Sequence, residues 1–156
     1  MAPSNITYQK ISIKYGIFVG IAHIIYFLLM RILGLQHIIE LSFLSALFLI
    51  IGIVVAIAKY KKALKGHINY LKGLAIGATV GVVSSSLLAI FLVIYISLFD
   101  NSYLTYLQAS YLFPESLTIL SLFMLAIIYG TWPGFIIAFI AMQWYKEADH
   151  SLTERI

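Results

Sequence analysis

One ionisable side chain lies inside a long apolar segment, and its position makes it the first candidate for chemistry. The segment from Tyr15 to Leu35 is interrupted only by His23 and Arg31. An ionisable residue in such a segment is costly to expose to lipid, so it marks a functional site by default. The rise of a helix places Ser85 and Thr131, in two later apolar segments, at a depth similar to that of His23. We therefore predict a polar layer of His23, Ser85 and Thr131 near the middle of the molecule.

Two interpretations of this layer remain open. It could bind a proton or a solute, with His23 as the group that titrates in the physiological range. Alternatively, His23 is a neutral side chain that is hydrogen-bonded to a serine or tyrosine hydroxyl, while the serines bond to carbonyls one helical turn earlier. We favour the second interpretation, because one histidine without a carboxylate in the same segment is a poor proton relay.

The remaining sequence offers no arrangement of residues that is typical of catalysis. It contains no cysteine, which excludes disulfide bonds, thiolate nucleophiles and cysteine-ligated metals. His37, His67 and His150 are isolated from one another, and their spacing does not suit a metal site. We find neither a phosphate-binding glycine loop nor a serine-hydrolase motif. We therefore expect no enzymatic activity, no metal and no cofactor.

Small residues recur at every fourth position in two of the apolar segments. These two ladders consist of Gly73, Gly77, Gly81, Ser85 and Ala89 in one segment and of Ala126, Gly130, Gly134 and Ala138 in the other. In lipid, helices associate through the close backbone approach that such stripes allow. The ladders could face each other inside one bundle, which we favour because the pattern is common in membrane helices. They could instead dock a second copy of the chain or another membrane subunit.

The composition of the chain is that of a membrane protein. Of its 156 residues, 62% are hydrophobic and 10% are charged, whereas soluble domains have about 45–50% and about 25%. Four runs are long enough for a helix to cross a bilayer, which needs about 20 apolar residues: 15–35, 38–58, 73–99 and 116–145. None has the alternating pattern of a membrane β-barrel strand. We predict an all-α integral membrane four-helix bundle that forms one transmembrane domain over residues 1–156.

The segment 100–115 between the third and fourth runs is predicted to lie outside the membrane. Leu104 and Leu107 recur there at helical spacing, so we predict a short interfacial helix. The alternative is an extension of the third helix beyond the bilayer.

The turn between the first two runs is flanked by opposite charges. Arg31 and Glu40 lie on either side of it, and we expect them to pair. An exposed pair of this kind contributes only about 0–1 kcal/mol, so we assign it no activity.

Basic residues determine the predicted orientation. Nine of the ten lysines and arginines lie on one side: two before the first run, five in the loop 59–72 and two near the C-terminus. The positive-inside rule then places both termini in the cytoplasm, and the net charge of +4 requires no nucleic acid partner. The loop lysines could bind anionic lipid headgroups or, as we favour, be solvated determinants of topology. The candidate headgroup ligands are Lys59, Lys61, Lys62 and Lys65.

Several short motifs resemble those of a known family. They are Lys14-Tyr15-Gly16-Ile17, Ala58-Lys59-Tyr60-Lys61-Lys62, Gly66-His67-Ile68-Asn69-Tyr70 and Lys72-Gly73-Leu74-Ala75-Ile76-Gly77. Over roughly residues 11–146, the chain resembles the small bacterial four-span membrane proteins known as domain of unknown function 4199 (DUF4199). The resemblance implies a location in a bacterial inner membrane. It carries over no activity and no site residue.

These observations lead to one functional prediction and one alternative. We predict a non-enzymatic scaffold or accessory subunit that lies in the lipid bilayer and docks to other membrane proteins through its small-residue faces. The alternative is a small dimeric transporter or channel, with the layer around His23 lining a path. A cavity that reaches this layer would favour the alternative, and dry packing around His23 would exclude it.

Overall fold

The computed structural model describes residues 7–35, 38–66, 68–110 and 115–153, with the backbone alone at 39, 40, 42 and 146–153. Six helices and no strand lie within these ranges, so the all-α prediction is confirmed. The helices are α1 (Tyr8–Ile32), α2 (Ile39–Leu44), α3 (Ala46–Ala63), α4 (Tyr70–Leu98), α5 (Ser102–Gln108) and α6 (Ile119–Thr153).

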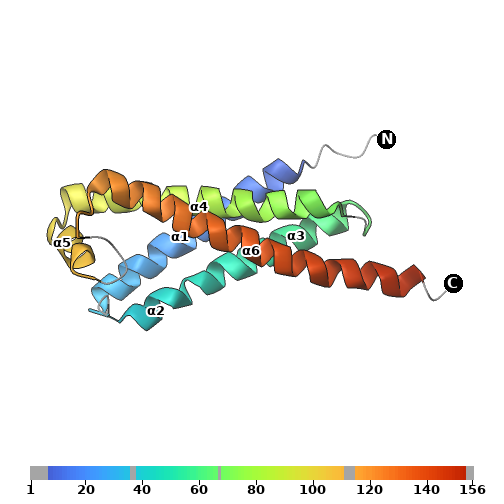
Figure 1. Ribbon diagram of the computed structural model, residues 1–156, viewed down its shortest axis with the longest axis horizontal. Coiled ribbons are helices and arrows are strands. Elements are labelled where there is room, and N and C mark those ends of the chain that lie inside the picture. The colour runs from blue at the N-terminus through green and yellow to red at the C-terminus, as the bar shows by residue number, and fades with distance from the viewer. Residues whose placement is uncertain (1–6, 36–37, 67, 111–114, 154–156) are drawn as a thin grey trace.

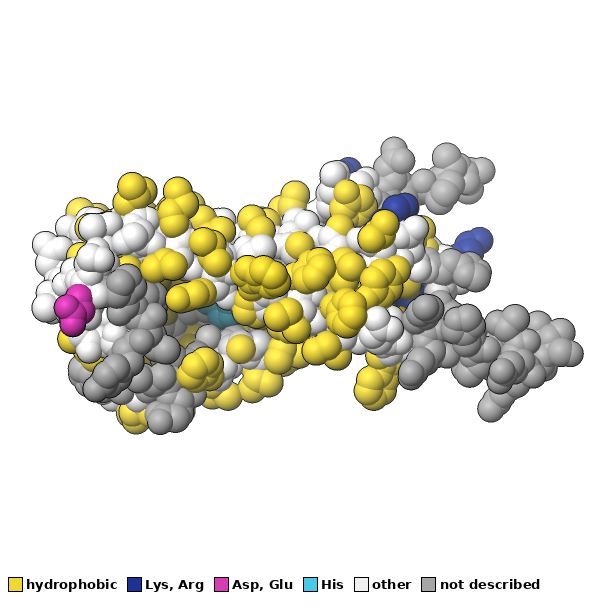
Figure 2. Space-filling view, viewed as in Figure 1, with side chains coloured by type: hydrophobic (Ala, Val, Ile, Leu, Met, Phe, Trp, Pro, Cys, Tyr) yellow, Lys and Arg dark blue, Asp and Glu magenta, His cyan; other side chains and the backbone are white. Residues whose placement is uncertain are grey.

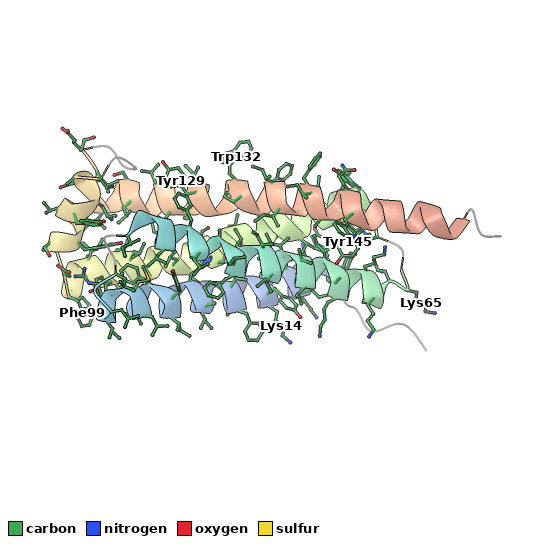
Figure 3. All side chains as sticks on the ribbon, turned by 90° about the horizontal axis from the view of Figure 1, so that it is seen from below. Lys14, Lys65, Phe99, Tyr129, Trp132 and Tyr145 are labelled. Atoms are coloured by element: carbon green, nitrogen blue, oxygen red, sulfur yellow. The ribbon has the colours of Figure 1, made fainter. Side chains whose placement is uncertain are left out.

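The helices form an elongated bundle whose two ends differ in character. The chain passes along the long axis in α1, then in α2 and α3 together, then in α4 and finally in α6 (Figure 1). Both termini and the connection between α3 and α4 lie at one end, whereas α5 lies at the other (Figure 1). Figure 3 shows Lys14 and Lys65 toward the first end and Phe99 at the second. We call these the basic end and the α5 end.

The second pass differs from the predicted single span over 38–58. It is divided at Ser45 into α2, of 6 residues, and α3, of 18 residues. Only α1, α4 and the segment Ile119–Tyr145 of α6 are helices long and apolar enough to cross a membrane. Within the described residues the structure therefore shows three such helices, and the fourth predicted span, 38–58, corresponds to the divided pass of α2 and α3. At this interruption, two side chains of α1 bind the backbone carbonyls of Leu41 and Ser45, as described below.

Helix α4 lies at the centre and packs against α6 through the two ladders of small residues. A Cβ atom built on Gly81 would lie 2.8 Å from the carbonyl oxygen of Gly130, and one on Gly134 would lie 2.8 Å from the carbonyl oxygen of Gly77. Real Cβ atoms are not found so close to backbone, so only glycine allows this approach. The ladders therefore meet within one chain. At the basic end the pattern changes, since Gly73 faces Met142.

Helix α1 also packs closely against α4 through a glycine, on another side of α4. A Cβ atom on Gly20 would lie 2.8 Å from the Leu87 side chain and 3.2 Å from the Ser84 carbonyl oxygen. Close helix contact of this kind is the main source of association between helices in lipid. The basic half of the bundle is filled by a cluster of buried residues that includes Ile53, Ile57, Ile76, Val80 and Ala138.

The α5 end has its own small core. Helix α4 ends at Leu98, and the separate helix α5 follows, so the structure has the predicted short helix and not an extension of the third helix. Buried side chains from α4, α5 and the start of the last pass contact one another here; they are Ile96, Leu107, Leu117 and Leu122. The two cores leave a less densely filled zone between them.

The packing of α4 on α6 predicts that a large side chain destabilises the protein at Gly81 but not at the neighbouring position 82. Gly81→Ile should lower the free energy of unfolding by about 1–3 kcal/mol, because the new side chain meets the α6 backbone. The adjacent Val82→Ile is the matched control, since Val82 is 40% exposed and faces away from the core. Thermal unfolding followed by circular dichroism in lipid nanodiscs measures the difference. Equal stability of the two variants would contradict the packing.

Candidate functional site

The interruption of the second pass is bound by two polar side chains of α1. His23 Nε2 lies 3.0 Å from the carbonyl oxygen of Ser45, and the Tyr26 hydroxyl donates to the carbonyl oxygen of Leu41 at 2.6 Å. The backbone of Ser45 keeps right-handed helical angles and its carbonyl oxygen also accepts from the Phe48 N–H at 3.1 Å, so the side chains of α1 add bonds at a local interruption of the helix. The histidine and the tyrosine therefore stabilise the break.

A cavity of about 380 Å³ lies beside this break. Small-molecule sites usually occupy about 300–1,000 Å³ and combine apolar walls with a few polar groups, and this cavity has both properties. Its polar edge includes His23, Ser45, Ser84, Ser85 and Ser110. Histidine surface, coloured cyan, is visible in a recess between the yellow hydrophobic surfaces in Figure 2.

The remaining walls of the cavity are largely apolar and aromatic. They include Leu88, Leu92 and Ala126, with Tyr103 and Tyr106 from α5. Tyr129 also lines the cavity, and Figure 3 shows it on the side of α6 that faces α2, whereas Trp132 points away. The cavity therefore lies between the core of the basic half and the core of the α5 end.

A second cavity, of about 200 Å³, shares part of this wall. His23, Ser45 and Tyr103 line both cavities, and the smaller one continues to Arg31 near the end of α1. The imidazole ring of His23 therefore lies where the two spaces adjoin.

The predicted polar layer is assembled only in part. His23 and Ser85 line the same cavity, but Thr131 is not among the described residues that line it. The Ser85 hydroxyl donates to the Gly81 carbonyl oxygen at 2.7 Å, and the Thr131 hydroxyl donates to the Ile127 carbonyl oxygen at 2.7 Å. Both hydroxyls thus bond to carbonyls of their own helices, as the second interpretation predicts, and the Ser85 hydroxyl also lies 3.4 Å from the Ile127 carbonyl oxygen of α6. His23 differs from that interpretation, because its partner is a backbone carbonyl.

Arg31 ties three helices together at the α5 end. Its guanidinium forms an ion pair with Asp100, and its Nε donates to the Tyr95 hydroxyl at 2.8 Å. Its central carbon also lies 5.4 Å from the centre of the Tyr103 ring, within the range of cation–π attraction. The sequence prediction paired Arg31 with Glu40, whose side chain lies outside the described residues. The partner that the structure provides, Asp100, is 69 positions along the chain.

Tyr103 is the α5 residue whose hydroxyl is most affected by this environment. Burial raises the pKa of its phenol to about 12; the neighbouring phenol of Tyr106 adds to the increase, and the Arg31 charge opposes it. The ring also closes one wall of both cavities. Tyr103 therefore remains a neutral phenol at every physiological pH.

The four predicted headgroup lysines lie together at the basic end. Lys59, Lys62 and Lys65 are exposed. Lys61 instead donates to the Tyr145 carbonyl oxygen at 3.2 Å and lies 5.3 Å from the centre of the Tyr145 ring. It thereby links α3 to α6.

The chain matches a known protein family, but it matches no curated protein and no solved structure. A family model described as "Protein of unknown function (DUF4199)" matches residues 14–147. The match covers every described residue that lines the cavity.

The contact between Arg31 and Asp100 predicts energetic coupling. In a cycle of Arg31→Gln, Asp100→Asn and the double variant, we expect a coupling energy of about 0.5–3 kcal/mol, because the side chains are only 24% and 16% exposed. The free energy of unfolding in lipid nanodiscs is the quantity to measure. Strictly additive effects would show that the ion pair does not hold α1 to the α5 end.

The environment of Tyr103 predicts a dependence of stability on alkaline pH. The unfolded phenol ionises near its ordinary pKa of 10.0, whereas the folded phenol keeps its proton up to about 12. The contribution of Tyr103 to stability should therefore be complete below pH 10 and be lost as the pH rises toward 12. Tyrosinate absorbance should show a late phase that Tyr103→Phe removes.

Proposed function

The chain belongs to the DUF4199 family of proteins of unknown function, as its sequence motifs predicted, and for this member we propose an integral membrane protein that binds a small, mostly apolar molecule. The binding site is the cavity beside the break at Ser45. The role is non-enzymatic, and the molecule enters from the half of the bundle that carries α5.

The outer surface supports a position within a bilayer. Large hydrophobic side chains cover the long sides of the bundle, as the yellow surface in Figure 2 shows. Phe18, Trp132 and Ile140 are 58%, 65% and 63% exposed, which in water would leave a large unpaired apolar surface. In a bilayer these apolar side chains would contact the hydrocarbon chains of the lipids. The bilayer is therefore the proposed surroundings of all four passes, including the divided pass of α2 and α3.

The divided pass is compatible with this position. Backbone that departs from a regular helix is tolerated at membrane depth only where protein buries it or where it lines a cavity. The Ser45 carbonyl accepts from His23 and Ser45 lines the cavity, so the break meets this condition. We propose that the chain crosses a bacterial inner membrane four times, with the basic end and both termini in the cytoplasm.

The cavity supports binding better than it supports docking through the small-residue faces. Those faces are occupied by each other, since Gly77 and Gly81 of α4 contact the backbone of Gly130 and Gly134 of α6. A partner subunit would have to displace α6 to reach them. The single observation that carries the proposal is a cavity of about 380 Å³ at which His23 and several serines converge.

The same geometry favours a binding site over an open channel. The packed cluster around Ile53, Ile57 and Ile76, three side chains with no exposed surface, separates the cavity from the basic end. A solute that enters from the α5 end therefore meets a closed floor. At the basic end, Lys59, Lys62 and Lys65 are proposed to contact anionic headgroups and fix the orientation.

Filling the cavity provides the test. Ala126→Phe places a ring inside it, whereas Met124→Phe places the same ring on a side chain position that is 54% exposed. With 4-hexylphenol as the probe, the wild-type protein in nanodiscs should bind more probe than empty nanodiscs do. We expect Ala126→Phe to weaken binding by about tenfold or more, because lost contact area in a pocket of this size is worth at least one factor of ten.

Met124→Phe is the control for this experiment. Met124→Phe should bind 4-hexylphenol as the wild type does, and both variants should keep the thermal midpoint of a folded protein. Equal binding by Ala126→Phe and Met124→Phe would show that the probe does not occupy the cavity.

A further inference from the structure

We infer that the molecule bound in this cavity is recognised through a hydroxyl group that donates a hydrogen bond to His23 Nδ1. This inference rests on the proposed function of the cavity and adds the chemical class of its ligand. The class is a neutral apolar molecule with a hydrogen-bond donor, such as a phenol or an alcohol.

The hydrogen bond to Ser45 determines which nitrogen of His23 carries the proton. A carbonyl oxygen can only accept, so Nε2, which lies 3.0 Å from it, must be the donor. In a neutral imidazole the other nitrogen then has a lone pair and can only accept. Nδ1 is buried and has no hydrogen-bond partner among the described groups.

The surroundings of the ring keep it neutral. None of the described residues that line the two cavities is acidic, and the one charged residue among them, Arg31, has the same sign as a protonated histidine. A buried charge without an opposite partner is strongly unfavourable, whereas a neutral ring loses only one hydrogen bond. His23 therefore presents an acceptor to any molecule that lies against it.

Three serines of the cavity, like His23 Nδ1, can only accept hydrogen bonds from a ligand. The hydroxyls of Ser84 and Ser85 donate to the Gly81 carbonyl oxygen at 3.1 and 2.7 Å, and the Ser110 hydroxyl donates to the Leu107 carbonyl oxygen at 2.7 Å. Each hydroxyl has a single proton, so these side chains retain only lone pairs for a ligand. Together with His23 Nδ1, these three hydroxyls give the cavity a set of acceptor groups, which we call the acceptor surface.

An acceptor surface selects by chemistry as well as by shape. A carboxylate, an ether or a ketone brings only lone pairs and would leave the acceptors without partners, whereas a hydroxyl satisfies one of them. The apolar walls, which include Leu88, Leu92 and Ala126, suit the hydrocarbon part of the molecule. A membrane-soluble alcohol or phenol combines both features.

A pair of probes that differ only in the donor tests the inference. 4-Hexylphenol and its methyl ether, 4-hexylanisole, have the same ring and chain, but only the phenol can donate. After correction for partition into empty nanodiscs, the wild-type protein should bind the phenol about tenfold more tightly, which is the usual effect of one buried hydrogen bond.

Two variants separate the acceptor from the structural role of His23. The amide of His23→Gln can still donate to the Ser45 carbonyl, and its one acceptor, Oε1, is attached to the same carbon as that donor and does not occupy the position of Nδ1, so the preference for the phenol should fall to about onefold. Tyr26→Phe is the matched control, because it removes the neighbouring bond to Leu41 and leaves His23 intact. That variant should keep the preference.

A spectroscopic measurement tests the same contact without altering His23. In a protein with His37→Gln, His67→Gln and His150→Gln, the one remaining histidine can be followed by its ring nitrogen resonances. The phenol should shift the Nδ1 resonance strongly, and the anisole should not.

The outcomes distinguish this inference from the proposed function. If neither probe binds above empty nanodiscs, the proposed function of the cavity is wrong. If both bind equally well, the cavity is a binding site but the inferred donor recognition is wrong. A phenol preference that persists in His23→Gln, or an Nδ1 resonance that does not respond to the phenol, would also overturn the inference.

Discussion

The close approach of α4 to α6 is the contact on which the rest of the structure depends. Inside a bilayer there is no hydrophobic gain from pairing two apolar helices, so the pairing needs atomic contact along the backbones. Gly77, Gly81, Gly130 and Gly134 make that contact possible because they have no Cβ atom. With α6 held there, α4 can bind α1 on another side, and α3 covers the remaining core. The order of the helices around α4 follows from this one interface.

The cavity is a consequence of where this tight packing stops. Towards the α5 end, the small residues of α4 are serines, whose hydroxyls bond mainly to their own helix, and Ser85 makes one long contact of 3.4 Å to the Ile127 carbonyl oxygen of α6. The second pass is interrupted at the same level, and α2 makes its main contacts with α3. The space that results is lined on one side by polar groups, of which His23 Nδ1 has no partner among the described groups. The two nitrogens of His23 differ in their surroundings. Nε2 bonds to the Ser45 carbonyl oxygen, whereas Nδ1 is buried and has no hydrogen-bond partner among the described groups.

The features that could be predicted from the sequence are those that depend on a local pattern of residues along one helix. Ladders with a spacing of four residues can only form a stripe on a helix, so the residues that bring α4 and α6 together were identifiable. The separate helix α5 was identifiable from its spacing as well. Of the predicted polar layer, His23 and Ser85 line one cavity, whereas Thr131 was assigned by depth alone, and depth does not determine the direction in which a side chain points.

The sequence by itself determined the helical class, the segments that can lie in lipid, the concentration of lysines at one end and the membership of a family. These properties depend on composition and on short periods, which need no knowledge of neighbours. Only the tertiary structure decided that Asp100 and not Glu40 is the described carboxylate on Arg31, and that the second pass breaks at Ser45. Both depend on groups brought together from distant parts of the chain, and an apolar interior makes such partners decisive because no water can replace them.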